Sequence, residues 1–234
     1  SPNIDRLAMR GVRFDRAYCN YPVCNASRTS FLSGRRPDTT RIVDNITPPR
    51  TFLSDVVFLP EHFRQQGYRT IKVGKIFHTG DEFEDPRSWD VDIRETIRAK
   101  TPPPEQILRK QGPIGIVLRA NDEDTWDGFV ARKAVELLEK CVKEGKPFFV
   151  AAGFRRPHAP YIAPEKYYAL YDSDKLKPRY GPLEHLMNIP DLALTYRLGE
   201  AKFPKKRPGD TMAAYYASIS FMDAQVGVLL DALD

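Results

Sequence analysis

Cysteine is scarce in this sequence, and long apolar runs are missing from it. The three cysteines, Cys19, Cys24 and Cys141, do not form a disulfide framework, and their odd number leaves at least one thiol unpaired. No apolar run approaches the roughly 20 residues of a membrane-spanning helix. Internal repeats and low-complexity tracts are also missing. The 234 residues therefore predict a globular protein with a substantial core and no membrane span.

The excess of positive charge is confined to one segment. The formal net charge is +5, and residues 175–208 account for all of it with eight basic and three acidic side chains. A basic loop on a neutral body favours an anionic ligand bound at one place. The segment has few aromatic residues between its charges and no nucleic-acid recognition motif, so we expect no nucleic-acid partner.

Apolar periodicity predicts alternating helices and strands. Helices are expected over residues 1–11, from about 26 to 34, and over 59–66, 125–144 and 211–233; strands are expected over 12–18, 68–73 and 146–152. Ser1 and Asp210 are the expected N-caps of the first and last helices, and Gly11, Gly67 and Gly145 the expected helix stops. This alternation predicts an α/β fold with a largely parallel sheet.

Two of the predicted helices should each bury one face. The buried positions expected in the helix over 125–144 are Phe129, Val130, Ala134, Leu137, Leu138 and Cys141. Those expected in the helix over 211–233 are Ala214, Ile219, Met222, Val226 and Leu230. Two long segments rich in proline and charge, about 79–121 and 172–210, read as loop insertions that serve a site.

Candidate site residues follow two predicted strands. Lys75 and His78 come after the strand over 68–73, and His158 comes after the strand over 146–152. Ligands of open α/β sheets bind at the carboxyl ends of the strands. The alternative, that each histidine is an ordinary surface-loop residue, is about equally compatible with the sequence.

Cys24 is expected at the N-terminus of the short helix that ends at Gly34. Free N–H groups and the helix dipole favour a bound anion there, and Arg28 lies one turn later on the same face. A small buried cysteine beside a helix cap is the structural alternative. A cysteine protease would need a histidine to activate the thiol, and no cysteine-protease signature is present.

Several blocks resemble the sulfatase family. Residues 24–28 (CNASR) and 32–35 (LSGR) resemble its signature, Cys-x-Pro-Ser-Arg followed by Leu-Thr-Gly-Arg, with Ala26 where proline is usual, at a position that the modifying enzyme reads. Four further blocks resemble the iduronate-2-sulfatases and their bacterial relatives: 1–8 (SPNIDRLA), 34–40 (GRRPDTT), 73–78 (VGKIFH) and 217–223 (ASISFMD).

The resemblance implies a fold and an activity. It implies an alkaline-phosphatase-like α/β sandwich with helices on both faces of a largely parallel central sheet. Residues 1–234 would be an internal part of the N-terminal catalytic domain, without its first strand and its late metal-binding strand. The implied reaction removes sulfate from a sulfated sugar or uronic acid. The family is periplasmic, secreted or lysosomal, although residues 1–10 are polar and read as a helix rather than a signal peptide.

The resemblance also implies roles for individual residues. Cys24 would be oxidised by a formylglycine-generating enzyme, and a hydroxyl of the hydrated aldehyde, activated by Ca²⁺, would attack sulfur. Arg28 would hold the hydrate and help neutralise the metal site, and Lys75 would bind the sulfate oxygens. His78 would assist the hydrate, and His158 would protonate or orient the leaving oxygen. Of the metal ligands only Cys24, as formylglycine, would lie in this chain, so the 234 residues alone are expected to be inactive.

Three points stay open at this stage. His62 and His185 match no family position and are expected to be structural or rim residues. A phosphodiester or phosphonate hydrolase of the same superfamily is one alternative function. A catalytically silent protein that binds sulfated glycans through residues 175–208 is another.

Overall fold

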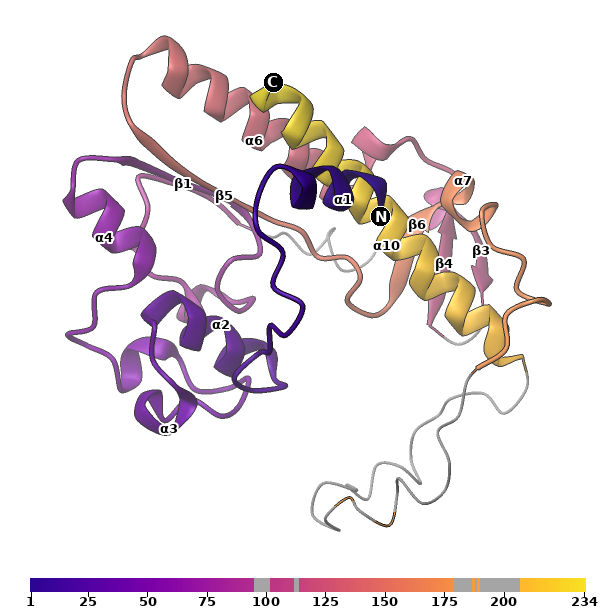
Figure 1. Ribbon diagram of the computed structural model, residues 1–234, viewed down its shortest axis with the longest axis horizontal. Helices are drawn as coiled ribbons and strands as arrows, with labels where there is room; N and C mark the ends of the chain where they lie inside the picture. The colour runs from indigo at the N-terminus through magenta and orange to yellow at the C-terminus, as the bar shows by residue number, and fades with distance from the viewer. Residues whose placement is uncertain (95–101, 112–113, 179–186, 188, 190–206) are drawn as a thin grey trace. The chain divides into compact units, whose positions relative to one another are not determined.

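The computed structural model in Figure 1 describes residues 1–94, 102–111, 114–178, 187, 189 and 207–234. The chain divides into two compact units, each described by itself. Unit 1 comprises residues 1–102, 122–155 and 222–234, and unit 2 comprises 103–121 and 156–221. No helix in the described parts of the chain is both long and apolar enough to cross a membrane.

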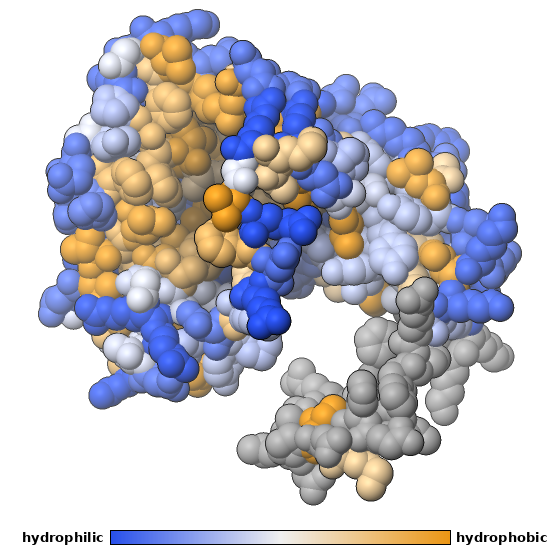
Figure 2. Space-filling view, in the orientation of Figure 1, coloured by the Kyte–Doolittle hydropathy of each residue, from blue (hydrophilic) through white to orange (hydrophobic). Residues whose placement is uncertain are grey.

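Unit 1 is built on a parallel sheet. Its strands are β1 (Arg69–Gly74), β2 (Val91–Ile93) and β5 (Phe148–Gly153), in the order β2-β1-β5. The strands expected over 68–73 and 146–152 are therefore confirmed to within two residues, and so is their parallel pairing. Figure 2 shows apolar residues gathered over the part of unit 1 that contains β1 and β5, where residues 148–152 are partly exposed.

The helices of unit 1 agree with the sequence pattern. They are α1 (Pro2–Met9), α2 (Cys24–Ser33), α3 (Pro37–Thr40), α4 (Leu59–Gln65), α6 (Trp126–Lys143), and the 3-10 turns η1 (Pro49–Thr51), η2 (Asp81–Phe83) and η4 (Asp122–Asp124). Three helix ends are followed by a glycine at positive φ: Gly34 at 66°, Gly67 at 83° and Gly145 at 64°. Glycine lacks the Cβ that makes this conformation costly for other residues, which explains why these helices end there.

Two apolar clusters lie on opposite faces of the unit 1 sheet. In one, Ile71 and Val73 of β1 pack against Val130, Ala134 and Cys141 of α6. In the other, buried residues from the segments around the sheet pack with Phe149 and Ala151; they are Leu32, Leu53, Val56, Phe58, Phe77 and Trp89. The side chains of β5 alternate between the two clusters, as in a sheet covered on both faces, whereas β1 contributes apolar residues to the first cluster.

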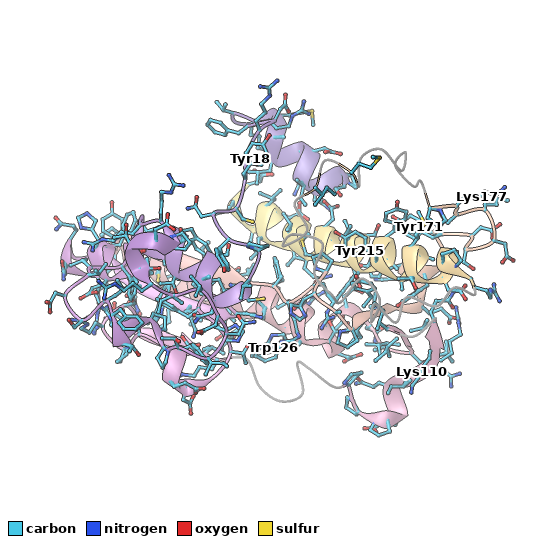
Figure 3. All side chains as sticks on the ribbon, turned by 90° about the horizontal axis from the view of Figure 1, so that it is seen from below. Tyr18, Lys110, Trp126, Tyr171, Lys177 and Tyr215 are labelled. Carbon is cyan, nitrogen blue, oxygen red and sulfur yellow. The ribbon has the colours of Figure 1, made fainter. Side chains whose placement is uncertain are left out.

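Unit 2 has a small mixed sheet. Its strands are β3 (Ile107–Gln111), β4 (Gly115–Leu118) and β6 (Tyr161–Pro164), with β3 and β4 antiparallel and β4 and β6 parallel. The 3-10 turn η3 (Pro104–Gln106), α7 (Glu165–Tyr168) and residues 208–221 of α10 (Pro208–Leu233) complete it. Tyr215 of α10, labelled in Figure 3, packs its ring edge-on against Tyr161, with 5.3 Å between the ring centroids.

The strand expected over residues 12–18 is not formed. Val12, Phe14 and Tyr18 are 80%, 77% and 84% exposed, and Tyr18 is labelled in Figure 3. Alternating apolar residues make a strand only when a neighbouring strand accepts their backbone hydrogen bonds, and none of the described strands pairs with this segment. The expectation of a long loop over 79–121 is also wrong, because this segment contains β2, β3 and β4. Most of the second expected loop, 172–210, lies outside the described residues.

The N-terminus of α1 is capped from a distance. The side chain of Ser1 makes no capping hydrogen bond, contrary to expectation. The carboxylate of Asp223, in α10, instead accepts the backbone N–H groups of Asn3 at 3.1 Å and Ile4 at 2.9 Å. These are first-turn donors that have no partner within the helix. A residue more than 200 positions away thus supplies the cap that the local sequence suggested.

Helix details also differ from the expected faces. Phe129 is 40% exposed rather than buried, and it lies beside Trp126. The last helix begins at Pro208, so Asp210 falls in its first turn rather than capping it. Ala214 and Leu230 are buried as expected, whereas Ile219, Met222 and Val226 are only partly buried. The further buried apolar positions of this helix are Ala213, Ala217 and Phe221.

Candidate active site

Cys24 is the first residue of α2 and is partly buried. Its neighbour Asn25 is fully buried and anchors this end of the helix: the Asn25 backbone N–H donates to Asn45 Oδ1 at 3.0 Å, and its side-chain amide donates to the Thr47 carbonyl at 2.8 Å. Asp44 accepts hydrogen bonds from the backbone of Thr47 and of Ile46, which lower the pKa of its carboxyl. The backbone that carries Cys24 therefore rests on an ordered turn.

Arg28 joins α2 to the end of β1. Its Nη1 donates to the carbonyl oxygens of Lys75 at 2.8 Å and Ile76 at 2.7 Å. Because Arg28 follows Cys24 by four residues on the same helix face, these bonds bring the N-terminal turn of α2 to the chain that leaves β1. The structure thus places the guanidinium of Arg28 in contact with the backbone of Lys75.

A pair of glycines determines how the chain leaves β1. Gly74 has φ of 85°, and a Cβ added there would lie 2.3 Å from the Gly153 carbonyl oxygen. A Cβ on Gly153 would lie 2.2 Å from the Lys75 carbonyl oxygen. The Lys75 backbone N–H donates to the Gly153 carbonyl at 2.9 Å, and Lys75 is only 6% exposed. Close approach of two backbones, possible only without side chains, therefore positions Lys75.

His78 is partly buried and packs against an aromatic ring. The imidazole lies edge-on to Phe83, with 4.8 Å between ring centroids and 86° between ring planes. Phe83 is 4% exposed and belongs to η2. Phe83 was not identified from the sequence, since a lone apolar residue in a charged loop gives no signal of a partner.

Ion pairs hold the segment that follows His78, and one of them is made by Asp90. Asp90 Oδ1 accepts from Arg64 Nε at 2.8 Å, and its Oδ2 accepts from the Thr70 backbone at 2.9 Å. Partial burial alone would raise the pKa of Asp90, but the bonds from Thr70 and Arg64 outweigh it and lower that pKa.

His158 belongs to unit 2, where the buried Arg156 holds its loop. Arg156 Nη1 donates to the His158 carbonyl at 2.6 Å and also to the Pro160 carbonyl. His158 is exposed, and its Nδ1 lies 2.6 Å from the Ala159 carbonyl. A carbonyl oxygen can only accept, so Nδ1 carries the hydrogen in this contact. Arg156 was not identified from the sequence, although it lies only two residues before His158.

The described residues do not by themselves fit a calcium ion. Ca²⁺ takes six to eight oxygen ligands. Within the parts of the chain that the structure describes, no group of three or more His, Cys, Asp or Glu side chains could hold a metal. Residue 24 alone would supply only a small part of such a set.

The remaining candidates lie elsewhere. All three cysteines are free thiols, with Cys19 exposed and Cys141 buried in the apolar cluster under α6, where burial raises the pKa of its thiol. His62 lies on α4, where it is exposed and lies edge-on to Phe63. His185 and most of the basic segment 175–208 lie outside the described residues.

Comparisons with known proteins indicate the family of the chain. The sulfatase family model matches residues 1–234. Iduronate 2-sulfatase of Homo sapiens is 33% identical over the whole chain, and a sulfatase of Formosa agariphila is 30% identical, also over the whole chain. The chain spans 47% and 50% of these two relatives, about half their length.

A solved structure supports the fold. The phosphonate monoester hydrolase of Agrobacterium radiobacter superposes with a TM-score of 0.77 over 99% of this chain and 54% of its own, at 18% identity. The likeness confirms the expected α/β fold of the alkaline-phosphatase-like type. Because the family model matches every residue and the aligned relatives are sulfatases, the chain belongs to the sulfatase family.

Proposed function

We propose that the protein is a sulfuric ester hydrolase that removes sulfate from a sulfated sugar or uronic acid, with residue 24 as formylglycine. The observation that carries the proposal is the Arg28 link, because it joins the helix that begins at Cys24 to the chain that carries Lys75 and His78. Iduronate 2-sulfatase, a relative with 33% identity, supports a sulfated uronic acid as the substrate class.

In the proposed reaction, the hydrated aldehyde at position 24 offers two hydroxyl groups. The first loses its proton to solvent as its oxygen attacks sulfur and the bond from sulfur to the ester oxygen breaks. The leaving oxygen takes a proton from His158 Nε2. The second hydroxyl then gives its proton to His78 while the carbon–oxygen bond to sulfate breaks. Sulfate leaves and the aldehyde is restored. A serine or cysteine nucleophile could not follow this route, since neither has a second hydroxyl on the same carbon.

The basic side chains stabilise charge in this proposal. The ammonium of Lys75, almost fully buried, binds sulfate oxygens, whose charge rises as the sulfur is attacked. Arg28 holds the hydrate, and its two bonds to backbone carbonyls keep its planar guanidinium in one orientation. Calcium stays part of the proposal for the complete protein, with residue 24 as one ligand and with carboxylates from outside the described residues.

Mass spectrometry and kinetics test the proposal. The complete protein is expressed with and without a formylglycine-generating enzyme, and the peptide that contains position 24 is weighed. We expect aldehyde at position 24 and hydrolysis of aryl sulfate and of sulfated uronic acid disaccharides, with both lost in the Cys24→Ala variant. A protein that carries the aldehyde but leaves every sulfate ester intact would contradict the proposal.

The same preparations separate the alternatives. Faster hydrolysis of aryl phosphate or phosphonate esters than of aryl sulfate would identify a hydrolase of the related class. An unmodified thiol with sulfated-glycan binding and no turnover would identify a binding protein. If residues 175–208 steer a polyanionic substrate, kcat/KM on the polymer should fall as ionic strength rises, whereas a flat dependence would exclude steering.

A further inference from the structure

The chain that follows His78 is attached to unit 1 by several carboxylates. Asp85 Oδ2 accepts from Arg50 Nη2 at 2.8 Å, and Asp90 Oδ1 accepts from Arg64 Nε at 2.8 Å. Both cations come from earlier parts of unit 1, in η1 and α4. Asp85 and Asp90 therefore tie the segment that contains them to earlier parts of unit 1.

The most deeply buried of these attachments is at Lys72. Lys72 lies in the middle of β1 and is 0% exposed. Its Nζ lies 2.5 Å from Glu84 Oε2 and 2.8 Å from Asp92 Oδ1, so the three side chains form an ion triad. Arg94 contacts the other oxygen of Asp92 at 2.8 Å and also reaches Asp81 at 2.6 Å.

Burial makes the triad a strong constraint. A buried ammonium is tolerated only when anionic groups stay in contact with it, because the interior solvates charge poorly. Burial is also the main influence on Glu84 and raises the pKa of its carboxyl, while Lys72 opposes that rise. Moving Glu84 away from Lys72 would leave the buried ammonium with Asp92 as its remaining counter-ion within the triad and would separate the Glu84 carboxylate from Lys72.

Phe83 connects the triad to the candidate site. It directly precedes Glu84, and its ring meets the His78 imidazole at 4.8 Å between centroids. Phe83 is 4% exposed, so its ring has little room for another position. Residues on both sides of it, Asp81 and Glu84, are held by ion pairs.

We propose that Phe83 and the ion triad Lys72–Glu84–Asp92 are positioning residues for His78. The triad holds η2 next to β1. The ring of Phe83, which belongs to η2, then holds the imidazole in place through the edge-on ring contact. Lys72 also lies three residues before Lys75, which directly follows β1, so the triad couples the placement of His78 to that of Lys75. This proposal rests on the proposed function, in which both residues act on the sulfate ester.

Two variants and one control test the proposal in the complete protein. Phe83→Leu keeps an apolar side chain but removes the ring, and Glu84→Gln keeps the shape of the carboxylate but removes its charge. The control is Asp90→Asn, which removes an anchor from the same segment without touching Phe83 or Lys72. Kinetics with an aryl sulfate give kcat and KM. The Cε1–H resonance of His78, assigned with a His78→Gln variant, reports the imidazole environment independently of turnover.

We expect Phe83→Leu and Glu84→Gln to lower kcat about tenfold to a hundredfold with little change in KM, because the imidazole acts in the chemical step and is displaced from its geometry. In both variants the His78 resonance should move from its wild-type position, since a facing aromatic ring shifts the signals of its neighbour. Asp90→Asn should leave the resonance and kcat near their wild-type values.

Two results would overturn the proposal. One is a wild-type His78 resonance in both Phe83→Leu and Glu84→Gln. The other is a loss of kcat in the Asp90→Asn control as large as in the two variants. Full activity of His78→Gln would instead remove His78 from the proposed reaction, and the resonance would still decide whether Phe83 and the triad position the imidazole.

Discussion

Replacing Gly74 by alanine should destabilise unit 1 clearly more than the same replacement at Gly67. The two glycines have nearly the same positive φ, 85° and 83°. A Cβ at Gly67 would meet nothing within 4 Å, whereas at Gly74 it would lie 2.3 Å from the Gly153 carbonyl oxygen and 3.0 Å from Val130 Cγ2. The pair therefore separates the cost of the backbone conformation from the cost of the steric conflict.

The magnitude follows from these two terms. Positive φ costs a residue with a side chain about 1–2 kcal/mol, and both variants incur it. The loss of unfolded-state freedom on going from glycine to alanine is also common to both. Only Gly74→Ala must in addition force apart two hydrogen-bonded backbones, for which overpacked sites suggest about 1–3 kcal/mol. We expect Gly74→Ala to be less stable than Gly67→Ala by that last amount.

Urea unfolding followed by tryptophan fluorescence measures this difference in the 234-residue chain. Its two tryptophans, Trp89 and Trp126, both lie in unit 1, one in each apolar cluster of the sheet. The free energies of unfolding of the wild type and the two variants are compared with the same slope of free energy against urea concentration for all three. Equal losses in the two variants would refute the conclusion that Gly74 is required for close backbone approach. In the complete protein, Gly74→Ala should also lower kcat, because it displaces Lys75.

Three further substitutions test other contacts. Arg50→Met removes the nearer of two cations that the buried carboxylates of Asp85 and Glu61 share, leaving Arg87 at 3.7–3.8 Å, and should cost about 1–3 kcal/mol in the same fluorescence assay. Asp90 has a lowered pKa, so its contribution to stability is present above the unfolded-state value of 3.8 and is lost as the pH falls through the folded-state value. Asp90→Asn should therefore be less stable than the wild type at neutral pH, and the gap in urea midpoint should shrink below pH 3.8. Tyr168→Phe removes the donor to the Tyr161 carbonyl at 2.7 Å and should weaken unit 2 by about 1–2 kcal/mol, seen as faster hydrogen exchange in β4 and β6. Unchanged stability at neutral pH in any of the three would contradict the contact concerned.

Local patterns predicted most of the secondary structure. The glycines that end α2, α4 and α6 were visible because positive φ favours glycine wherever it occurs. The apolar runs of β1 and β5 were visible because a covered parallel sheet requires them. Residues 12–18 carried an equally good pattern and form no strand, since a strand depends on a partner that its own residues do not specify.

The residues of the candidate site also fall into two groups, those that the sequence predicted and those that it did not. The sequence singled out Cys24, Arg28, Lys75, His78 and His158, because each follows a helix start or a strand end and fits a family motif. It did not single out Phe83, Lys72 or Arg156. Their roles depend on contacts with a ring, two carboxylates and two carbonyls, and such contacts have no fixed spacing along the chain.

The sequence by itself thus determined the family, the alternation of helices and strands, and the residues able to carry out chemistry. These properties depend on residue type and short spacing. Only the tertiary structure decided that Arg28 bonds to the carbonyls of Lys75 and Ile76, that Asp223 caps α1, and that Lys72 is buried between two carboxylates. Each of these contacts joins segments that are distant along the chain, and it forms because a buried donor or charge must find a partner in whichever segment the fold places beside it.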